Sequence, residues 1–439
     1  MTQTEVGAGA GARRSGAVGR RLLAMATFVL AVILPLLRQQ GNRSWDSVWA
    51  EDGSVFYQQA IDSPGLRVLA RGYNGYMVLP PRILSLPSPF IPLEHLALYF
   101  AISSAVVIAL LAFFTYHSAR GWIPSRAVRL ALASFVVLMP AMGPENTSTV
   151  TNTIWSFAAV APWAFVSLEE RRGDVVARCL VVFFAVTGTV LGFVFIPLAI
   201  GWACIRKTRA AYAVLVAYLV GLTVQVLVMM STASELIPVP PQRPVDDFVR
   251  LVGVRVFALY LVGQESAVSL WKANGPGAVF GATVIVVTIF AAAAWRTDRR
   301  HLLLGLTMAA YGLGSFLVLV FGRGTLLFRL TGTFDMFAAM RYSVPANLML
   351  ASGLAILLSG DRSRRWASGV RWAYVAHLSV LMVVCFSVTG YRALGPSWSE
   401  HLDVARKVCL MDPAPAKVEV PQDALSYSKI RVSCSRVLR

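Results

Sequence analysis

Two adjacent acidic residues follow the first long apolar stretch of the sequence. Glu51 and Asp52 stand side by side in the run Trp45–Gly53. Neighbouring carboxylates repel each other, so one of them tends to hold its proton more tightly unless a cation lies between them. Such a pair suits a general base, or the oxygen ligands of a divalent cation such as Mg²⁺ or Mn²⁺. The alternative is a helix N-cap, because Asp52 precedes residues 53–60, which favour a short amphipathic helix.

Aromatic and amide side chains form two further clusters in the segments that follow. Aromatic rings can stack on the faces of sugars, and amides can bond to sugar hydroxyls. At a membrane boundary, however, tyrosine and tryptophan also form a belt with no role in binding. The first segment, with Tyr73, Asn74 and Tyr76, therefore suits either a sugar site or such a belt. The second, residues 143–155, is dense in hydroxyls and amides and contains Asn152 and Trp155.

Arginines stand close to the ends of several apolar stretches. An arginine at a helix end can extend its charged group into the interface, which is the plainer interpretation. Several arginines that face a cavity would instead bind an anionic headgroup such as a phosphate. The candidates are Arg323, Arg329 and Arg341, the last followed directly by Tyr342, whereas Arg82 follows Pro80 and Pro81 in the first long connection.

Common catalytic motifs are absent from the sequence. There is no GxxxxGK[ST] loop, no HExxH and no GxSxG, and the five histidines are scattered along the chain. An ATP-driven motor, a zinc protease and a serine hydrolase are therefore disfavoured. Any chemistry must use carboxylates, arginines and amides.

The composition shows what must position these residues. Of 439 residues, 56% are hydrophobic and only 14% are charged, whereas soluble domains average about 25% charged residues. The apolar residues come in long runs, and about 20 such residues cross a bilayer. We predict an all-α, polytopic transmembrane bundle of about eleven spans. They are 22–38, 95–116, 130–142, 153–168, 179–190, 191–205, 210–230, 277–295, 301–321, 344–358 and 373–389.

Two features of this plan are irregular. The spans 179–190 and 191–205 are short and are separated only by a weak break at Thr187–Thr189, so they form either two crossings or a re-entrant pair. The segment 248–263 is apolar but contains Arg250 and Arg255, which places it at the interface.

The arginine pattern orients the bundle. With the N-terminus in the cytoplasm, the cytoplasmic connections hold half of the 40 basic residues although they are short, so their density of basic residues is several-fold higher than outside, as the positive-inside rule requires. The net charge of +18 is thus mainly a topology signal, and no nucleic acid partner is expected. Residues 1–21 are expected to be a disordered basic cytoplasmic tail. The longer polar connections, 39–94, 143–152, 231–276 and 322–343, then lie outside.

An odd number of crossings places the C-terminal segment, residues 390–439, outside the cytoplasm. That compartment permits disulfides, and this segment contains Cys409 and Cys434. We predict that these two are bonded, with two free thiols as the alternative. The remaining cysteines lie in predicted spans and are expected to be apolar fillers.

At this point the chain resembles the GT-C superfamily of membrane glycosyltransferases. The resemblance covers most of residues 22–360 and is carried by four features, although the second lacks the histidine found in that stretch of the family. They are the acidic pair after the first span, Gly72–Tyr76 with Arg82, Thr151–Trp155 at the entry to a span, and the broken helix pair around Thr187–Thr189.

The resemblance implies a sugar transfer from a polyprenyl-phosphate carrier to a cell-envelope glycan or lipid acceptor, with inversion. Asp52, or Glu51, would take the proton of the acceptor hydroxyl. Arg341 and Arg82, with Arg323 and Arg329 behind them, would hold the donor phosphate. Tyr73, Asn74, Tyr76, Asn152, Trp155 and Tyr342 would line the sugar pockets.

The resemblance does not choose between a hexose and a pentose. The content of alanine, valine, arginine and glycine, with few lysines, is typical of an actinobacterium, so the expected location is a bacterial plasma membrane with the site on its outer face. The alternative function is a flippase or transporter for a lipid or a lipid-linked sugar. That class favours charged residues near the middle of the bilayer, where the spans here hold almost none.

Overall fold

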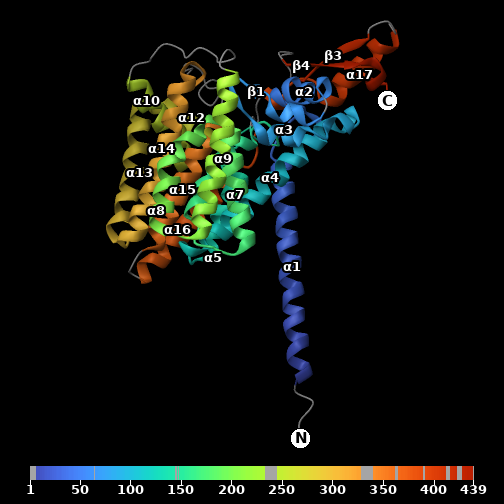
Figure 1. Cartoon of the computed structure of the whole chain (residues 1–439). Coiled ribbons are helices and arrows are strands. Elements are labelled where there is room, and N and C mark those ends of the chain that lie inside the picture. The colour runs from blue at the N-terminus through green and yellow to red at the C-terminus, as the bar shows by residue number, and fades with distance from the viewer. Residues whose placement is uncertain are drawn as a thin grey trace.

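A computed structural model shows that the chain folds into a helical bundle, with a cap of short helices and strands at one end (Figure 1). The structure describes residues 6–63, 65–143, 146, 148–232, 245–327, 340–360, 364–388, 391–411, 416–422 and 428–438. Helix α1 extends beyond the far end of the bundle, and α17 of the C-terminal segment lies in the cap. The first described helix and the C-terminal segment thus lie at opposite ends.

Each predicted span overlaps a helix. These helices are α1 (Val6–Leu37), α4 (Leu96–Ser118), α5 (Arg126–Leu138), α6 (Thr153–Val166), α7 (Arg172–Gly188), α8 (Ile196–Arg206), α9 (Arg209–Ser231), α13 (Pro276–Arg296), α14 (Arg299–Leu327), α15 (Val344–Ser359) and α16 (Arg364–Val384). Within the described residues, five helical stretches are long and apolar enough to cross a membrane, and four shorter ones are apolar. The chain is therefore a multi-pass membrane protein, while the count of eleven crossings stays a prediction.

Two boundaries differ from the sequence analysis. Helix α1 begins at Val6, within the stretch expected to be a disordered tail, because alanine and arginine favour a helix that continues outward from the apolar part. The break between the fifth and sixth predicted spans is present: α7 ends at Gly188, and Thr189 is extended and caps the short 3₁₀ turn Val190–Phe195 that leads into α8.

Helix α15 lies at the centre of the bundle and is buried along nearly its whole length. It packs against α14 through glycines. A Cβ atom at Gly353 would lie 2.6 Å from the carbonyl oxygen of Gly305, which is closer than a carbon and an oxygen that are not bonded can approach. Small residues of this kind allow two apolar helices to approach closely in a membrane.

The segment expected at the interface is a nearly continuous helix. It comprises α10 (Val245–Val252), a π-helical turn (Gly253–Ala258) and α11 (Leu259–Val262), followed by α12 (Gln264–Asn274). Residues 253–260 are buried rather than spread on a surface: the π-helical turn, which contains the buried Arg255, packs against α13, and α10 packs against α14. The backbone oxygen of Arg255 accepts a hydrogen bond from Asn347 of α15.

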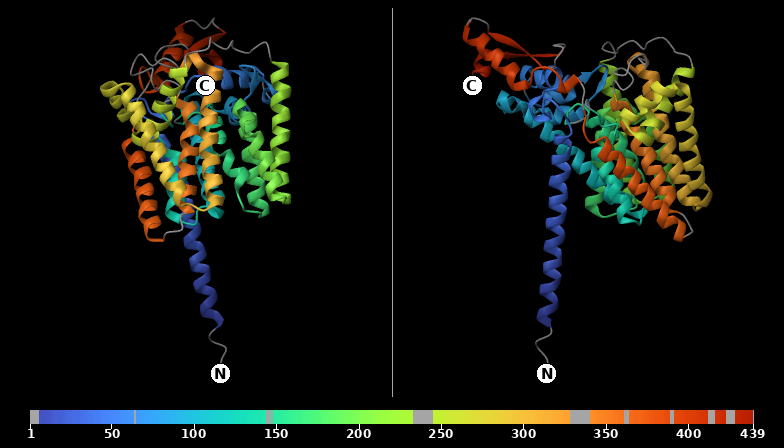
Figure 2. Two further views of the ribbon diagram at one scale, coloured as in Figure 1. Left: turned by 90° about the vertical axis from the view of Figure 1, so that its left-hand side faces the viewer. Right: turned by 180° about the vertical axis from the view of Figure 1, so that it is seen from behind.

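The cap is built from the first long connection and the C-terminal segment, which are far apart in sequence (Figure 2). Its elements are a π-helical turn (Asp52–Tyr57), α2 (Gln58–Asp62), β1 (Gly72–Tyr73), β2 (Tyr76–Met77), α3 (Leu79–Ser85), α17 (Trp398–Met411), β3 (Lys417–Pro421), β4 (Lys429–Ser433) and α18 (Cys434–Val437). Short 3₁₀ turns lie at Ser44–Asp46, Leu66–Ala70, Ser88–Phe90, Leu93–His95, Ala119–Gly121, Met340–Ser343 and Tyr391–Ala393.

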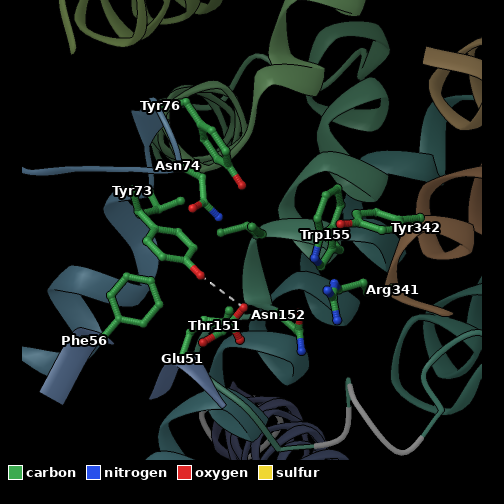
Figure 3. Close-up of a pocket in the computed structure, with 12 residues that line it drawn as sticks. Glu51, Phe56, Tyr73, Asn74, Tyr76, Thr151, Asn152, Trp155, Arg341 and Tyr342 are labelled. Carbon is green, nitrogen blue, oxygen red and sulfur yellow. Dashed lines mark hydrogen bonds between the residues drawn. The ribbon is translucent and has the colours of Figure 1, made fainter. Parts of the chain in front are cut away.

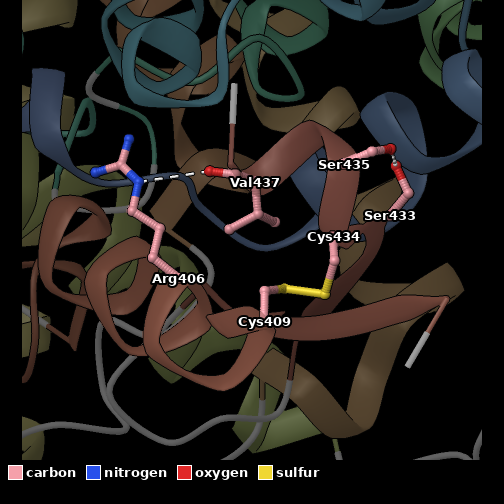
Figure 4. Close-up of a disulfide and its surroundings, with 6 residues drawn as sticks. All are labelled: Arg406, Cys409, Ser433, Cys434, Ser435 and Val437. Atoms are coloured by element: carbon pink, nitrogen blue, oxygen red, sulfur yellow. Dashed lines mark hydrogen bonds between the residues drawn. A yellow bond between two sulfur atoms is a disulfide. The ribbon is translucent and has the colours of Figure 1, made fainter. Parts of the chain in front are cut away.

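The C-terminal segment packs onto the first connection through a small apolar core that contains Val48, Tyr57, Trp398 and Ile430. The indole of Trp398 donates to the backbone oxygen of Leu93 at 2.7 Å. Strands β3 and β4 pair antiparallel between α17 and α18. A disulfide joins Cys409 of α17 to Cys434 of α18, the pairing expected from the sequence, and so closes this unit (Figure 4).

Candidate active site

A tight β-hairpin forms one wall of the candidate site. The Asn74–Gly75 turn between β1 and β2 has positive φ at both residues, 52° and 78°. Asparagine followed by glycine is the sequence that this type of two-residue turn favours. The turn places Tyr73 directly opposite Tyr76, so both rings project from the same face of the hairpin. Figure 3 shows Tyr73, Asn74 and Tyr76 on this side of the cavity.

Four stretches of the chain meet around a cavity of about 170 Å³. They are the acidic turn at Glu51, the hairpin, the entry to α6 and the 3₁₀ turn before α15. The lining residues are Glu51, Phe56, Tyr73, Asn74, Tyr76, Val78, Thr151, Asn152, Ile154, Trp155, Arg341 and Tyr342. The fold thus brings together most of the side chains singled out from the sequence, although they come from distant parts of the chain.

Glu51 supplies a carboxylate to the cavity. The hydroxyl of Tyr73 donates to Oε1 of Glu51 at 3.3 Å (Figure 3). Burial, followed by the charge of Glu51, raises the pKa of the Tyr73 hydroxyl. That hydroxyl therefore stays protonated at neutral pH and remains a donor to the carboxylate.

Asp52 does not line the cavity, and its side chain is only 1% exposed. Its carboxylate accepts hydrogen bonds from the backbone N–H groups of Val150 at 3.2 Å and Thr151 at 2.8 Å, and from the Thr151 hydroxyl. Burial raises its pKa from 3.8 to about 6, against the opposing effects of Thr151, Arg392 and Val150. Asp52 thus fastens the acidic turn to the segment that enters α6.

The N-cap alternative for Asp52 is wrong. A helical turn does begin at Asp52, but the residue in the cap position is Glu51, and no side chain caps the turn. The carboxylate of Asp52 is used by Val150 and Thr151 instead, because a buried carboxylate needs several donors.

Arg341 lies on the side of the cavity opposite the hairpin, beside Trp155 and Tyr342 (Figure 3). Its guanidinium carbon is 5.1 Å from the centre of the Tyr342 ring. The Tyr342 ring in turn meets Trp155 edge to face, with centroids 4.9 Å apart. The cavity therefore has a cation and two aromatic rings on one wall and a carboxylate on the other.

The other three candidate arginines lie elsewhere or cannot be described. Arg82, which is 1% exposed, donates to Gln59 Oε1 at 2.6 Å and to the backbone oxygen of Gly72 at 2.9 Å. It supports the hairpin from behind and does not line the cavity. Arg323 belongs to α14, but its side chain lies outside the described part of the chain, as does the whole of Arg329.

Among the described residues, no group of three histidine, cysteine, aspartate or glutamate side chains lies close enough to hold a metal ion. Both carboxylate oxygens of Asp52 already accept hydrogen bonds. The two neighbouring carboxylates therefore have different surroundings, because Asp52 is bound by Val150 and Thr151 while Glu51 lines the cavity.

Comparisons with known proteins give little to set beside this geometry. No family model matches the chain, and no curated protein matches it. Among solved structures, the chain is similar to ArnT from Cupriavidus metallidurans.

That ArnT structure is described as bound to undecaprenyl phosphate. The sequence identity is 13% and the TM-score is 0.41, over 83% of this chain. The chain spans about 64% of the length of that ArnT chain. At this TM-score the likeness to ArnT supports no conclusion about what this chain does.

Sequence reasoning missed five residues that shape the site. Phe56, Val78, Thr151 and Ile154 line the cavity, and Arg392 joins the loops that lead into Glu51 and Thr151. Each of the four lining residues lies within four positions of a predicted site residue, so their neighbourhood was a usable signal. Arg392 follows the last predicted span, and nothing in the sequence alone places it near Glu51.

Proposed function

We propose that this protein is a membrane glycosyltransferase of the GT-C type. It would move a sugar from a polyprenyl-phosphate carrier to a cell-envelope glycan or lipid acceptor. The observation that carries the proposal is the meeting of Glu51 and Arg341 in one cavity lined by aromatic and amide side chains. This reaction requires a carboxylate, a cation and flat apolar surfaces. The resemblance of the sequence to the GT-C superfamily implies the same three kinds of group.

Glu51 is our proposed general base. The acceptor hydroxyl would give its proton to Glu51 as its oxygen forms a bond to the anomeric carbon of the sugar. The bond from that carbon to the phosphate oxygen would break, and the phosphate would leave with the electron pair. Because the hydroxyl attacks the face opposite the leaving group, the configuration of the sugar would invert. In this proposal Asp52 does not touch the substrate but holds Thr151 and Asn152 in place.

Arg341 would bind the donor phosphate. Negative charge grows on the phosphate as its bond to the sugar breaks, and a cation already in position stabilises that charge without reorganisation. A guanidinium can bind two phosphate oxygens at once. Tyr76, Trp155 and Tyr342 offer ring faces and edges to the sugar, and Asn74 and Asn152 offer amides to its hydroxyls.

The proposed location of the site is the outer face of a bacterial plasma membrane. Strand β1, which contributes Tyr73 to the cavity, lies at the end of the bundle that carries the disulfide-bonded C-terminal segment. Disulfides persist in oxidising compartments outside the cytoplasm. The lipid donor would reach the cavity from the outer leaflet, with its chain among the apolar helices.

Transfer in membranes that contain the protein would test this function. We would offer a panel of labelled polyprenyl-phosphate pentoses and hexoses with a cell-envelope acceptor fraction, and compare the wild type with Glu51→Gln. Transfer from one donor that the substitution abolishes would support the proposal and identify the sugar. If correctly inserted protein used no donor in the panel, the glycosyltransferase proposal would fail, and flipping of the same lipids would be measured next.

A further inference from the structure

One buried arginine of the C-terminal segment crosslinks the two loops beneath the candidate site. Arg392 is 4% exposed. It donates to Ser47 Oγ at 2.9 Å and to the backbone oxygens of Ser44 at 3.1 Å and Ser47 at 3.2 Å. It also donates to the backbone oxygen of Ser148 at 3.3 Å. A single guanidinium therefore binds the loop before Glu51 and the loop before Thr151.

Both of these loops contain a residue in an unfavourable backbone conformation. Ala50, directly before Glu51, has φ = 42°, and Ser148 has φ = 58°. Residues other than glycine rarely adopt positive φ, and they persist there only where the surroundings hold them. On one side Asp52 holds the second loop through Val150 and Thr151. On the other side Arg392 holds both loops through their carbonyl groups.

The backbone around Arg392 is itself fixed. The N–H of Asn42 donates to the backbone oxygen of Ala393 at 3.1 Å, and the Asn42 amide donates to that of Gly395 at 2.7 Å. At Gly41, with φ = 80°, a side chain would lie 2.4 Å from the Ala393 oxygen, so only glycine fits. The guanidinium therefore projects from a rigid base.

We propose that Arg392 is a positioning residue that sets the distance between Glu51 and the Thr151–Asn152 wall of the cavity. The proposal rests on the proposed function, because it assigns Arg392 to the geometry of the same site. It also gives the C-terminal segment a role, which is to hold the acidic turn and the entry to α6 together from outside the bundle. The guanidinium of Arg392 further favours the ionised form of the Asp52 carboxylate, which accepts the hydrogen bonds from Val150 and Thr151.

The test compares Arg392→Ala and Arg392→Lys with a control, Arg406→Ala. Arg406 belongs to the same C-terminal segment. It forms ion pairs with Glu94 and Asp403, neither of which belongs to the two loops. The first readout is amide hydrogen exchange of residues 148–153 in the full-length protein. The second is kcat and KM for transfer of the donor sugar, with and without added guanidinium.

For Arg392→Ala we expect exchange at Val150 and Thr151 to rise about tenfold, because the loop would open locally. We expect kcat to fall roughly 10- to 100-fold, as a misplaced catalytic group would cause, with KM changed by less than about threefold. Added guanidinium or the lysine variant should restore part of kcat. Arg406→Ala should leave both readouts close to those of the wild type.

Unchanged exchange at residues 148–153 in Arg392→Ala would overturn the positioning role. So would a general rise in exchange across the cap with no rescue by guanidinium or lysine, because that would show loss of folding rather than of positioning. If the wild type transfers no sugar, the proposed function fails, while the exchange experiment still decides whether Arg392 positions the two loops.

Discussion

The Tyr73 hydroxyl donates to the Glu51 carboxylate across 3.3 Å, from the hairpin to the acidic turn. This contact fixes one oxygen of the only carboxylate among the cavity residues that the structure describes. In the proposed function, the second oxygen of Glu51 would accept the proton of the substrate hydroxyl. The position of this proposed base depends on a two-residue turn more than twenty residues further along the chain.

The first prediction concerns Glu51 itself. Glu51→Gln keeps the shape of the side chain but cannot accept a proton, so transfer should fall roughly 100- to 10,000-fold. Initial rates of transfer in membranes would measure this. The matched control is Glu94→Gln, an exposed cap carboxylate paired with Arg406, which should retain wild-type rates. Full activity of Glu51→Gln would remove Glu51 from the chemistry.

The second prediction isolates the Tyr73 hydroxyl. Tyr73→Phe keeps the ring against Phe56 but removes the donor to Glu51. Hydrogen bonds to charged groups contribute about 1.5–3 kcal/mol, so kcat should fall roughly tenfold or more while KM changes little. If KM for the sugar rose and kcat stayed constant, Tyr73 would serve as a stacking surface instead.

The third prediction concerns the donor phosphate. Arg341→Lys retains the positive charge but loses the planar fork that binds two oxygens. We expect KM for the lipid donor to rise roughly 10- to 100-fold because a charge-assisted hydrogen bond is lost. Arg406→Lys, in the cap, is the matched control. Identical kinetics for Arg341→Lys and the wild type would show that Arg341 does not bind the donor.

Much of the site could be predicted because its parts are locally encoded. The acidic pair, the aromatic hairpin and Arg341 each stand out by residue type and by their place next to an apolar stretch. The helices were predictable for the same reason, since about 20 consecutive apolar residues have few other uses. The Asn74–Gly75 pair also carried a signal for a hairpin that the sequence analysis did not use.

The remaining features depend on contacts between distant parts of the chain. Glu51 and Asp52 are equivalent in sequence, and only the partners Val150 and Thr151 separate a buried anchor from a carboxylate in the cavity. Arg82 looked like a phosphate ligand, but it is used to support the hairpin at Gly72. Such roles follow from tertiary packing, which a single sequence does not specify residue by residue.

The fourth prediction follows from the burial of Asp52. Its pKa in the folded protein is raised from 3.8 to about 6, so the folded state binds a proton there more tightly than the unfolded chain does. Ionisation of Asp52 therefore costs about 3 kcal/mol of folding stability, and this cost appears as the pH rises from about 4 to about 6.

Thermal unfolding in detergent between pH 4 and pH 7 would measure this cost. The wild type should lose stability as the pH rises, relative to Asp52→Asn, whose amide does not titrate. Parallel curves for the two proteins would show that Asp52 does not titrate in this range. Asp46→Asn is a suitable control, because that exposed carboxylate binds Ser399 at the surface of the cap.

The fifth prediction concerns the side of the membrane on which the cap lies. The Cys409–Cys434 disulfide and the arginine pattern both favour the outer side. In a variant whose other three cysteines are replaced by alanine, a membrane-impermeant thiol reagent should label intact cells only after mild reduction. A cysteine introduced by Arg299→Cys, in a connection predicted to be cytoplasmic, should react only in permeabilised cells. The reverse pattern would invert the topology and place the proposed site in the cytoplasm, where a lipid donor of the outer leaflet could not reach it.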